Sequence, residues 1–240
     1  MTRRTVPLLL LALLLLVTHV AGAQSAPEAD ALLDAVAERA ATLEDASFLL
    51  TGRLIDPDGT EIPLEIDVQT IPAERVASAY VLQPDALADN IIVLNGDTVA
   101  NYTFLTHQVT LFDADDPDAL GGLIGGGEEG ALDVTFDLNR LFAGYEARLL
   151  ERTETPQGPA DRIRLDNVEE GAVIAWVEAT VPDVTLLPYR LAFHGSDDAL
   201  LAEIRFEDLR LDQGLAAEDV TFLPEDAEIL DERASAPTGE

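Results

Sequence analysis

The chain has 240 residues, with 46 acidic against 14 basic side chains and a formal net charge of −32. A charge of this size excludes nucleic acid and anionic lipid headgroups as partners, because an acidic surface repels both polyanions. Cysteine is absent, which excludes disulfides, thiolate metal sites, a thiol nucleophile and an acylated N-terminal cysteine.

Residues 1–23 have the features of a secretory signal peptide. Two arginines precede an apolar run over residues 6–17, and Ala21-Gly22-Ala23 offers a small-x-small cleavage site. The run is too short to cross a bilayer comfortably. Cleavage after Ala23 removes two arginines and no acid, which takes the net charge from −32 to −34. We expect an exported, periplasmic protein, with the extracellular space as the alternative location.

The first half of the mature chain reads as one helix followed by strands. Apolar residues spaced by three and four over residues 27–45 predict an amphipathic helix. Strict alternation over residues 62–68 predicts a half-buried strand, and Asn95-Gly96 predicts a tight hairpin turn. The other strands are expected at residues 48–55, 76–82, 90–102 as a hairpin, and 107–112.

The second half begins with a loop and ends with a β meander. Residues 113–130 are acidic and then glycine-rich, which predicts a loop. A short amphipathic helix is expected at residues 136–142 and a hairpin at 145–165. Strands follow from residue 172, with a hairpin turn at 194–198 and a disordered tail at 233–240. We therefore expect a mainly β (α+β) domain over residues 24–232, a curved antiparallel sheet with helices on its concave side.

No residue pattern indicates catalysis, a metal or a cofactor. His194-Gly195-Ser196-Asp197 holds hydrolase residue types, but these are adjacent in a turn, whereas triad groups converge from separate elements. His107 has no metal-ligand spacing. In residues 113–118, a proline occupies a calcium-ligand position and no glycine follows. We expect a protein that is not an enzyme, with no catalytic residue, metal or cofactor.

A series of short motifs occurs in one order along the chain. They are Gln83-Pro84-Asp85, Ile91 to Val99 with Asn95-Gly96, Tyr102, Gln108-Val109, Leu187-Pro188, Phe206-x-Asp208-Leu209, Gly214-Leu215 and Phe222-x-Pro224. This ordered set resembles the outer-membrane lipoprotein carrier (LolA-like) family over about residues 30 to 232. The resemblance implies an unclosed β-barrel capped by helices, whose hollow holds acyl chains.

The sequence departs from the family in two respects. The family's Arg-Pro step, whose arginine locks the helical lid, is replaced by Ile71-Pro72, with Arg75 beyond it. The lid-locking role is therefore not carried over. The chain also has only 13 aromatic residues and relies on Leu, Ile and Val, which predicts a smaller and better-filled interior.

The resemblance implies a site and partners. The cavity is expected at Leu64, Ile66, Val68, Ile91, Val93 and Tyr102, and the lid at Leu33, Val36, Phe136, Leu141 and Phe142. An equally weighted interpretation is that the lid residues simply complete a closed core. The implied partners are acylated lipoproteins or lipid, an inner-membrane release complex and an outer-membrane acceptor. The protein itself is expected to be a monomer, since its charge opposes self-association.

The expected function is therefore a periplasmic carrier that shields acyl chains during transfer to the outer membrane. A first alternative is a sensing or regulatory module of the same fold. Such regulators carry a further domain, and the end of this chain at Glu240 favours the carrier. A second alternative is a structural exported domain with a filled core and no ligand.

Overall fold

The computed structural model describes residues 26–114, 116, 138–169 and 171–233. The predicted signal peptide, the glycine run at 121–127, Phe136 and residues 234–240 lie outside these ranges.

Twelve strands in the described part of the chain form one sheet. The strands are β1 (Ala46–Ile55), β2 (Glu61–Ile71), β3 (Val76–Gln83), β4 (Ile91–Asn95), β5 (Thr98–Thr103), β6 (Gln108–Asp113), β7 (Tyr145–Thr155), β8 (Gly158–Asn167), β9 (Trp176–Pro182), β10 (Arg190–His194), β11 (Leu200–Leu211) and β12 (Glu228–Asp231). Their order is β12-β6-β5-β4-β3-β2-β1-β11-β10-β9-β8-β7. Every neighbouring pair is antiparallel except β12 with β6, which is parallel.

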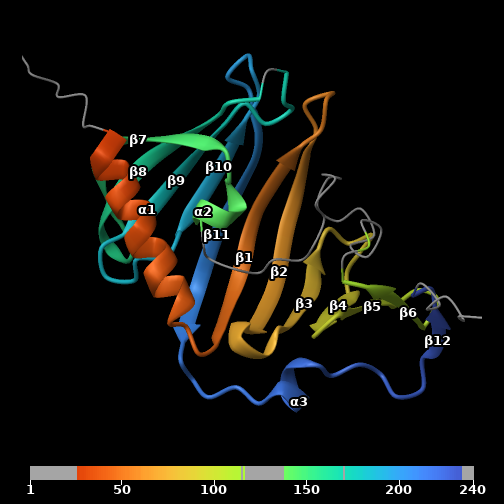
Figure 1. Cartoon of the computed structure of the whole chain (residues 1–240). Helices are drawn as coiled ribbons and strands as arrows, with labels where there is room; N and C mark the ends of the chain where they lie inside the picture. The colour runs from red at the N-terminus through yellow and green to blue at the C-terminus, as the bar shows by residue number, and fades with distance from the viewer. Residues whose placement is uncertain (1–25, 115, 117–137, 170, 234–240) are drawn as a thin grey trace, which may run out of the picture.

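The long helix α1 (Ala26–Ala41) crosses the concave side of the sheet in front of β7 to β11, and α2 (Leu138–Leu141) lies on the same side (Figure 1). The apolar stripe of α1 explains this position, since Leu33 and Val36 join the main hydrophobic core with residues of β1, β2 and β8 to β11. The architecture confirms the predicted fold class, a curved and unclosed sheet with helices on one side.

Local turn chemistry predicts the β4–β5 hairpin to within one residue. The two turn residues are Gly96 and Asp97, between the paired residues Asn95 and Thr98, and Gly96 has a φ of 62°, a left-handed conformation that glycine adopts without strain. The predicted turn at Asn95-Gly96 is therefore shifted by one position, because Asn95 is the last residue of β4. The predicted helix over 27–45 ends earlier, at Ala41, and its last residues lead into β1. The sheet is largely antiparallel, as predicted, and becomes mixed at one edge, where β12 pairs in parallel with β6.

After β11, the chain returns along one end of the sheet to its far edge (Figure 1). This C-terminal strap, residues 213–231, includes the short helix α3 (Ala217–Val220) and ends in β12. Its start is fixed by the buried carboxylate of Asp45, which accepts backbone N–H bonds from Gln213, Gly214 and Leu215 at 2.8, 2.7 and 3.1 Å. Val220 then packs against Ile71 and Val76, close to the short 3-10 helix η1 (Pro72–Glu74).

Candidate functional site

The concave face of the sheet carries a continuous aliphatic surface. Cross-strand pairing places alternate residues of β1 and β2 together on this face, with Phe48 opposite Val68 and Leu50 opposite Ile66. In β3, Ala79 pairs with Val68 and therefore lies on the same face. These residues belong to one cluster with the apolar residues of α1. The structure therefore brings the predicted residues Leu64, Ile66 and Val68 together on the face that the helices overlie.

Burial on this face decreases along β2, from buried to half-buried residues. Val68 is 4% exposed and Ile66 is 9% exposed, whereas Leu64 and Ile62 are only half-buried. Strand β1 shows the same trend, from the buried Phe48 to half-buried residues beyond it. Because α1 leads into the end of the sheet where Val68 lies, the concave face is filled at that end. Toward the β1–β2 turn, its aliphatic side chains are partly accessible.

The other three predicted cavity residues lie on the opposite, outer face. Ile91 pairs with Tyr102, and Val93 pairs with Ala100. Because side chains alternate along a strand, these residues point to the face opposite that of Ile92, which belongs to the main core. They form a second cluster with Val109, which Leu223 and Ala227 of the C-terminal strap cover. The structure therefore does not bring Ile91, Val93 and Tyr102 to the other three residues.

The described lid residues pack in two ways. Leu33 and Val36 of α1 are buried in the main core. Phe142, just after α2, is half-buried, with its ring centroid 5.3 Å from that of Tyr145 and 6.3 Å from that of Phe193. Leu141 is 40% exposed. Leu33, Val36 and Phe142 thus contact the concave core, and Leu141 faces solvent.

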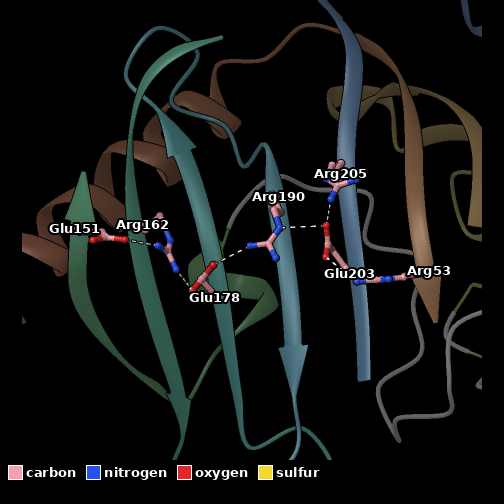
Figure 2. Close-up of polar contacts among 7 residues, drawn as sticks. All are labelled: Arg53, Glu151, Arg162, Glu178, Arg190, Glu203 and Arg205. Carbon is pink, nitrogen blue, oxygen red and sulfur yellow. Dashed lines mark hydrogen bonds and ion pairs between the residues drawn. The ribbon is translucent and has the colours of Figure 1, made fainter. Parts of the chain in front are cut away.

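An ion-pair ladder crosses the outer face of the sheet, and sequence reasoning missed it. Glu178 of β9 lies between Arg162 of β8 and Arg190 of β10, at 2.5 and 2.8 Å (Figure 2). Arg190 also pairs with Glu203 of β11 at 3.3 Å. The ladder extends to Glu151 at one end and to Arg53 at the other.

The arginines keep the two central carboxylates ionised. Burial alone would raise the pKa of Glu178, but the hydrogen bonds and charges of Arg162 and Arg190 outweigh it and lower that pKa. The pKa of Glu203 is lowered in the same way, with burial opposed mainly by Arg190. Because both central carboxylates have partners of opposite sign, the ladder is best understood as a structural element.

Among the described residues, no group of three or more His, Asp and Glu side chains could hold a metal ion. His107 bridges Tyr102 at 3.0 Å and Asp226 at 3.2 Å, and so links the β5–β6 turn to the strap. His194 stacks on Trp176 with ring centroids 3.6 Å apart. Across the same ranges, no helix has the length and apolar character needed to cross a bilayer.

The described residues form an unclosed, mostly antiparallel sheet with helices over an aliphatic concave face, which is the architecture that the resemblance to LolA-like proteins implies, and solved structures share this fold. No protein-family model and no curated protein matches the sequence. An uncharacterized conserved protein from Thermus thermophilus is similar at a TM-score of 0.61 and 19% identity, over 85% of this chain and 99% of that one.

Further similarity is to MucB. The TM-score is 0.54 at 15% identity, over 85% of this chain and 66% of MucB, so the chain spans about two thirds of its length. The structure of the Pseudomonas aeruginosa MucA/MucB complex is similar at a TM-score of 0.50 and 16% identity, over 81% of this chain and 61% of the matched chain. A LolA superfamily protein from Nitrosomonas europaea is more distant, with a TM-score of 0.40 and 13% identity over 81% of this chain and 97% of that one. At these identities the likeness establishes the fold alone.

Proposed function

We propose that the protein is a non-enzymatic carrier of the bacterial envelope, which shields acyl chains of lipoproteins or of another lipid on the concave face of its sheet. The observation that supports this most directly is the decrease in burial along β2 from Val68 to Ile62. A purely structural core would be filled along its whole length, because protein interiors are close-packed. A carrier instead needs aliphatic surface that a ligand can reach.

The energetics of such a site are favourable. Burying acyl chain gains about 0.8 kcal/mol per methylene, so about ten methylenes supply roughly 8 kcal/mol to offset the ordering of the chain and movement of the cover. The cover would be α1 together with the segment at α2, since Leu33, Val36 and Phe142 contact the same cluster. An empty carrier also needs this cover, because exposed apolar patches of several hundred Å² promote association.

The partners and the location follow from the same proposal. Cargo would arrive from an inner-membrane release complex and pass to an acceptor at the outer membrane, with the protein a periplasmic monomer. The predicted signal peptide at residues 1–23 supports export. The large negative charge favours a carrier that stays apart from anionic membrane surfaces between its two partners.

A binding assay tests the proposal. Mature protein, residues 24–240, is titrated with N-phenyl-1-naphthylamine, a neutral dye that fluoresces in apolar sites, and then with a synthetic diacylated lipopeptide. We expect saturable dye binding, displacement by the lipopeptide, and no displacement by the same peptide without acyl chains. Absence of dye binding together with absence of lipopeptide binding would contradict the carrier and favour a filled structural domain.

A sensing or regulatory module is the second candidate, and the similarity to MucB, whose complex with MucA has been solved, supports it. The two functions differ in the fate of the bound ligand. A carrier loaded with fluorescent lipopeptide passes it to acceptor vesicles, whereas a sensor retains the lipopeptide. Retention of a tightly bound lipopeptide in the presence of excess vesicles would favour the sensor.

A further inference from the structure

Strand β12 forms one edge of the sheet, at the end of the strap (Figure 1). The unpaired backbone groups of an edge strand attract other strands, so proteins keep such edges short and charged. β12 has only four residues, yet its Ile229 and Leu230 are 65% and 39% exposed. Leu105, in the turn that leads into β6, is 82% exposed. This edge is therefore more apolar than a merely protected edge would be.

The backbone of this segment points alternately to β6 and to the open edge, the side of β12 away from β6. The N–H groups of Glu228 and Glu232 donate to carbonyls of the β5–β6 turn and of β6, at 3.1 and 2.9 Å. In a parallel pair, only alternate residues bond to the same neighbour. The N–H and C=O groups of Ile229 and Asp231 therefore point to the open edge, where no described residue bonds to them. β12 thus offers the groups that a further strand needs.

The side chains along this edge have a defined charge pattern. Because side chains alternate along a strand, Glu228, Leu230 and Glu232 share one face. On the other face, Asp231 pairs with Arg233 at 2.5 Å. Glu228 and Glu232 are exposed, and neither forms an ion pair with a described residue. One face of the edge therefore carries an apolar side chain between two uncompensated carboxylates.

A second copy of this chain fits the open edge poorly. In an antiparallel pair, residues whose backbone groups face the partner strand lie opposite one another. The register that aligns two β12 strands then places Ile229 opposite Asp231 of the copy, and Glu228 opposite Glu232 of the copy. Like charges directly opposite destabilise a sheet, and the net charge of −32 opposes association further. The charges instead favour an occupant with basic residues.

The other edge of the sheet, β7, lacks this combination. β7 has 11 residues, and none of its large apolar side chains is exposed. Ala147 and Leu149 pack against the main core. Arg148 pairs with Asp166 at 3.3 Å, and Arg152 pairs with Asp183. This edge carries both signs of charge and serves as the internal control.

We propose that β12 is a docking strand for an extended basic segment of a protein partner, which adds to the sheet along the open edge. The complementary segment reads basic-x-apolar-x-basic, with its basic side chains beside Glu228 and Glu232 and its apolar side chain beside Leu230. In such complexes, main-chain hydrogen bonds give affinity and the alternate side chains give specificity. The proposal does not depend on what the concave face holds, because β12 contributes no residue to the main core cluster.

Three capped peptides test the docking strand in NMR titrations of isotope-labelled mature protein. The first, Ser-Arg-Thr-Val-Thr-Arg-Ser, has the complementary pattern. The second, Ser-Thr-Arg-Val-Arg-Thr-Ser, has the same composition but places the arginines on the face opposite the valine. The third replaces both arginines of the first by glutamate.

The first peptide should bind about fivefold or more tightly than the second, and the third should not bind. We expect the chemical-shift changes to centre on residues 228–232. Hydrogen exchange should slow at the amides of Ile229 and Asp231, which face the open edge. The preference for the first peptide should shrink at about 1 M salt, where the Debye length falls to about 3 Å.

Two pairs of variants locate the contact. Ile229→Pro removes an N–H that faces the open edge and leaves the bonds to β6 in place, whereas Ile229→Ala keeps that N–H. The proline variant should bind the first peptide about tenfold more weakly than the alanine variant. Glu228→Gln with Glu232→Gln should lose the discrimination between the two arginine peptides. Glu146→Gln with Glu154→Gln, which neutralises two exposed acids of β7, should keep it.

Each result supports or overturns a separate part of the proposal. Absence of binding by the first peptide, or shift changes centred elsewhere, would overturn the docking strand. Equal binding of the two arginine peptides would overturn the charge pattern, since net charge alone would then explain binding. Equal affinity of the proline and alanine variants would overturn strand addition. The dye and lipopeptide assay tests the concave face alone, so the docking strand and the proposed carrier can fail separately.

Discussion

Replacing one leucine on each face of the sheet tests whether the concave surface binds ligand. Leu64 lies on the concave face and is half-buried. Leu49 is also half-buried, but it lies on the outer face opposite Asp67. Both are replaced by glutamine, which has a similar length and a polar end. In the empty protein, either amide can reach water, so each variant should lose only about 1 kcal/mol of stability, or about 2–4 °C in Tm.

Ligand binding should separate the two variants. An acyl chain on the concave face would cover the Leu64→Gln amide and remove it from water, at a cost of about 1–3 kcal/mol. Since 1.4 kcal/mol is about tenfold in affinity, dye and lipopeptide binding should weaken by roughly 5- to 150-fold. Leu49→Gln should bind as the native protein does. The reasoning is refuted if Leu64→Gln binds with native affinity, or if both variants lose affinity equally.

Three further perturbations test the framework around the site. Gly52→Ala should lower Tm by about 6–12 °C, because its Cβ would lie 2.0 Å from the carbonyl oxygen of Glu203 and overpacking of this kind costs about 3 kcal/mol. A native Tm would show that β1 and β11 can move apart at this point without cost. Glu178→Gln should cost about 1 kcal/mol at pH 7, after allowance for solvent screening. Because the pKa of Glu178 is lowered from its ordinary value of 4.5, its contribution is present above that pH and lost as the pH falls through the lowered pKa, so urea-unfolding curves of variant and native protein should converge in acid. A gap that widens below pH 4.5 would contradict that assignment. Asp45→Ala leaves three backbone N–H groups without their acceptor, which should lower the free energy of unfolding by about 2–3 kcal/mol and speed hydrogen exchange in residues 213–215. Asp45→Asn should have an effect between those of the native protein and Asp45→Ala. Unchanged exchange in both variants would show that other contacts hold the strap.

The sequence predicted the concave site only where a strand is apolar on one face. Residues 62–68 alternate strictly between apolar and polar, so Leu64, Ile66 and Val68 could be assigned to one face. Residues 91–94 are Ile-Ile-Val-Leu, which gives no alternation. This strand is buried on both faces, by the core on one side and by the strap on the other. The assignment of Ile91 and Val93 to the cavity could not be tested without the register.

Other features depend on contacts between distant residues. Strand β12 is a short segment in an acidic tail, and only its pairing with β6 defines it. The ladder requires Glu178 to lie between two arginines from neighbouring strands, which is a matter of register rather than of composition. In a chain with 46 acids, sequence alone cannot separate a paired carboxylate from the many solvated ones. Turn signals, by contrast, are local, and Asn95-Gly96 located the β4–β5 hairpin to within one residue for that reason.

The central claim, that the concave face carries acyl chains, is tested most directly by native mass spectrometry of the mature protein purified from an exporting host, combined with extraction of bound lipid. We expect an acylated species bound in stoichiometric amount, which extraction removes and identifies. A ligand-free protein that also rejects acylated peptides added afterwards would contradict the account and leave a structural domain with a filled core.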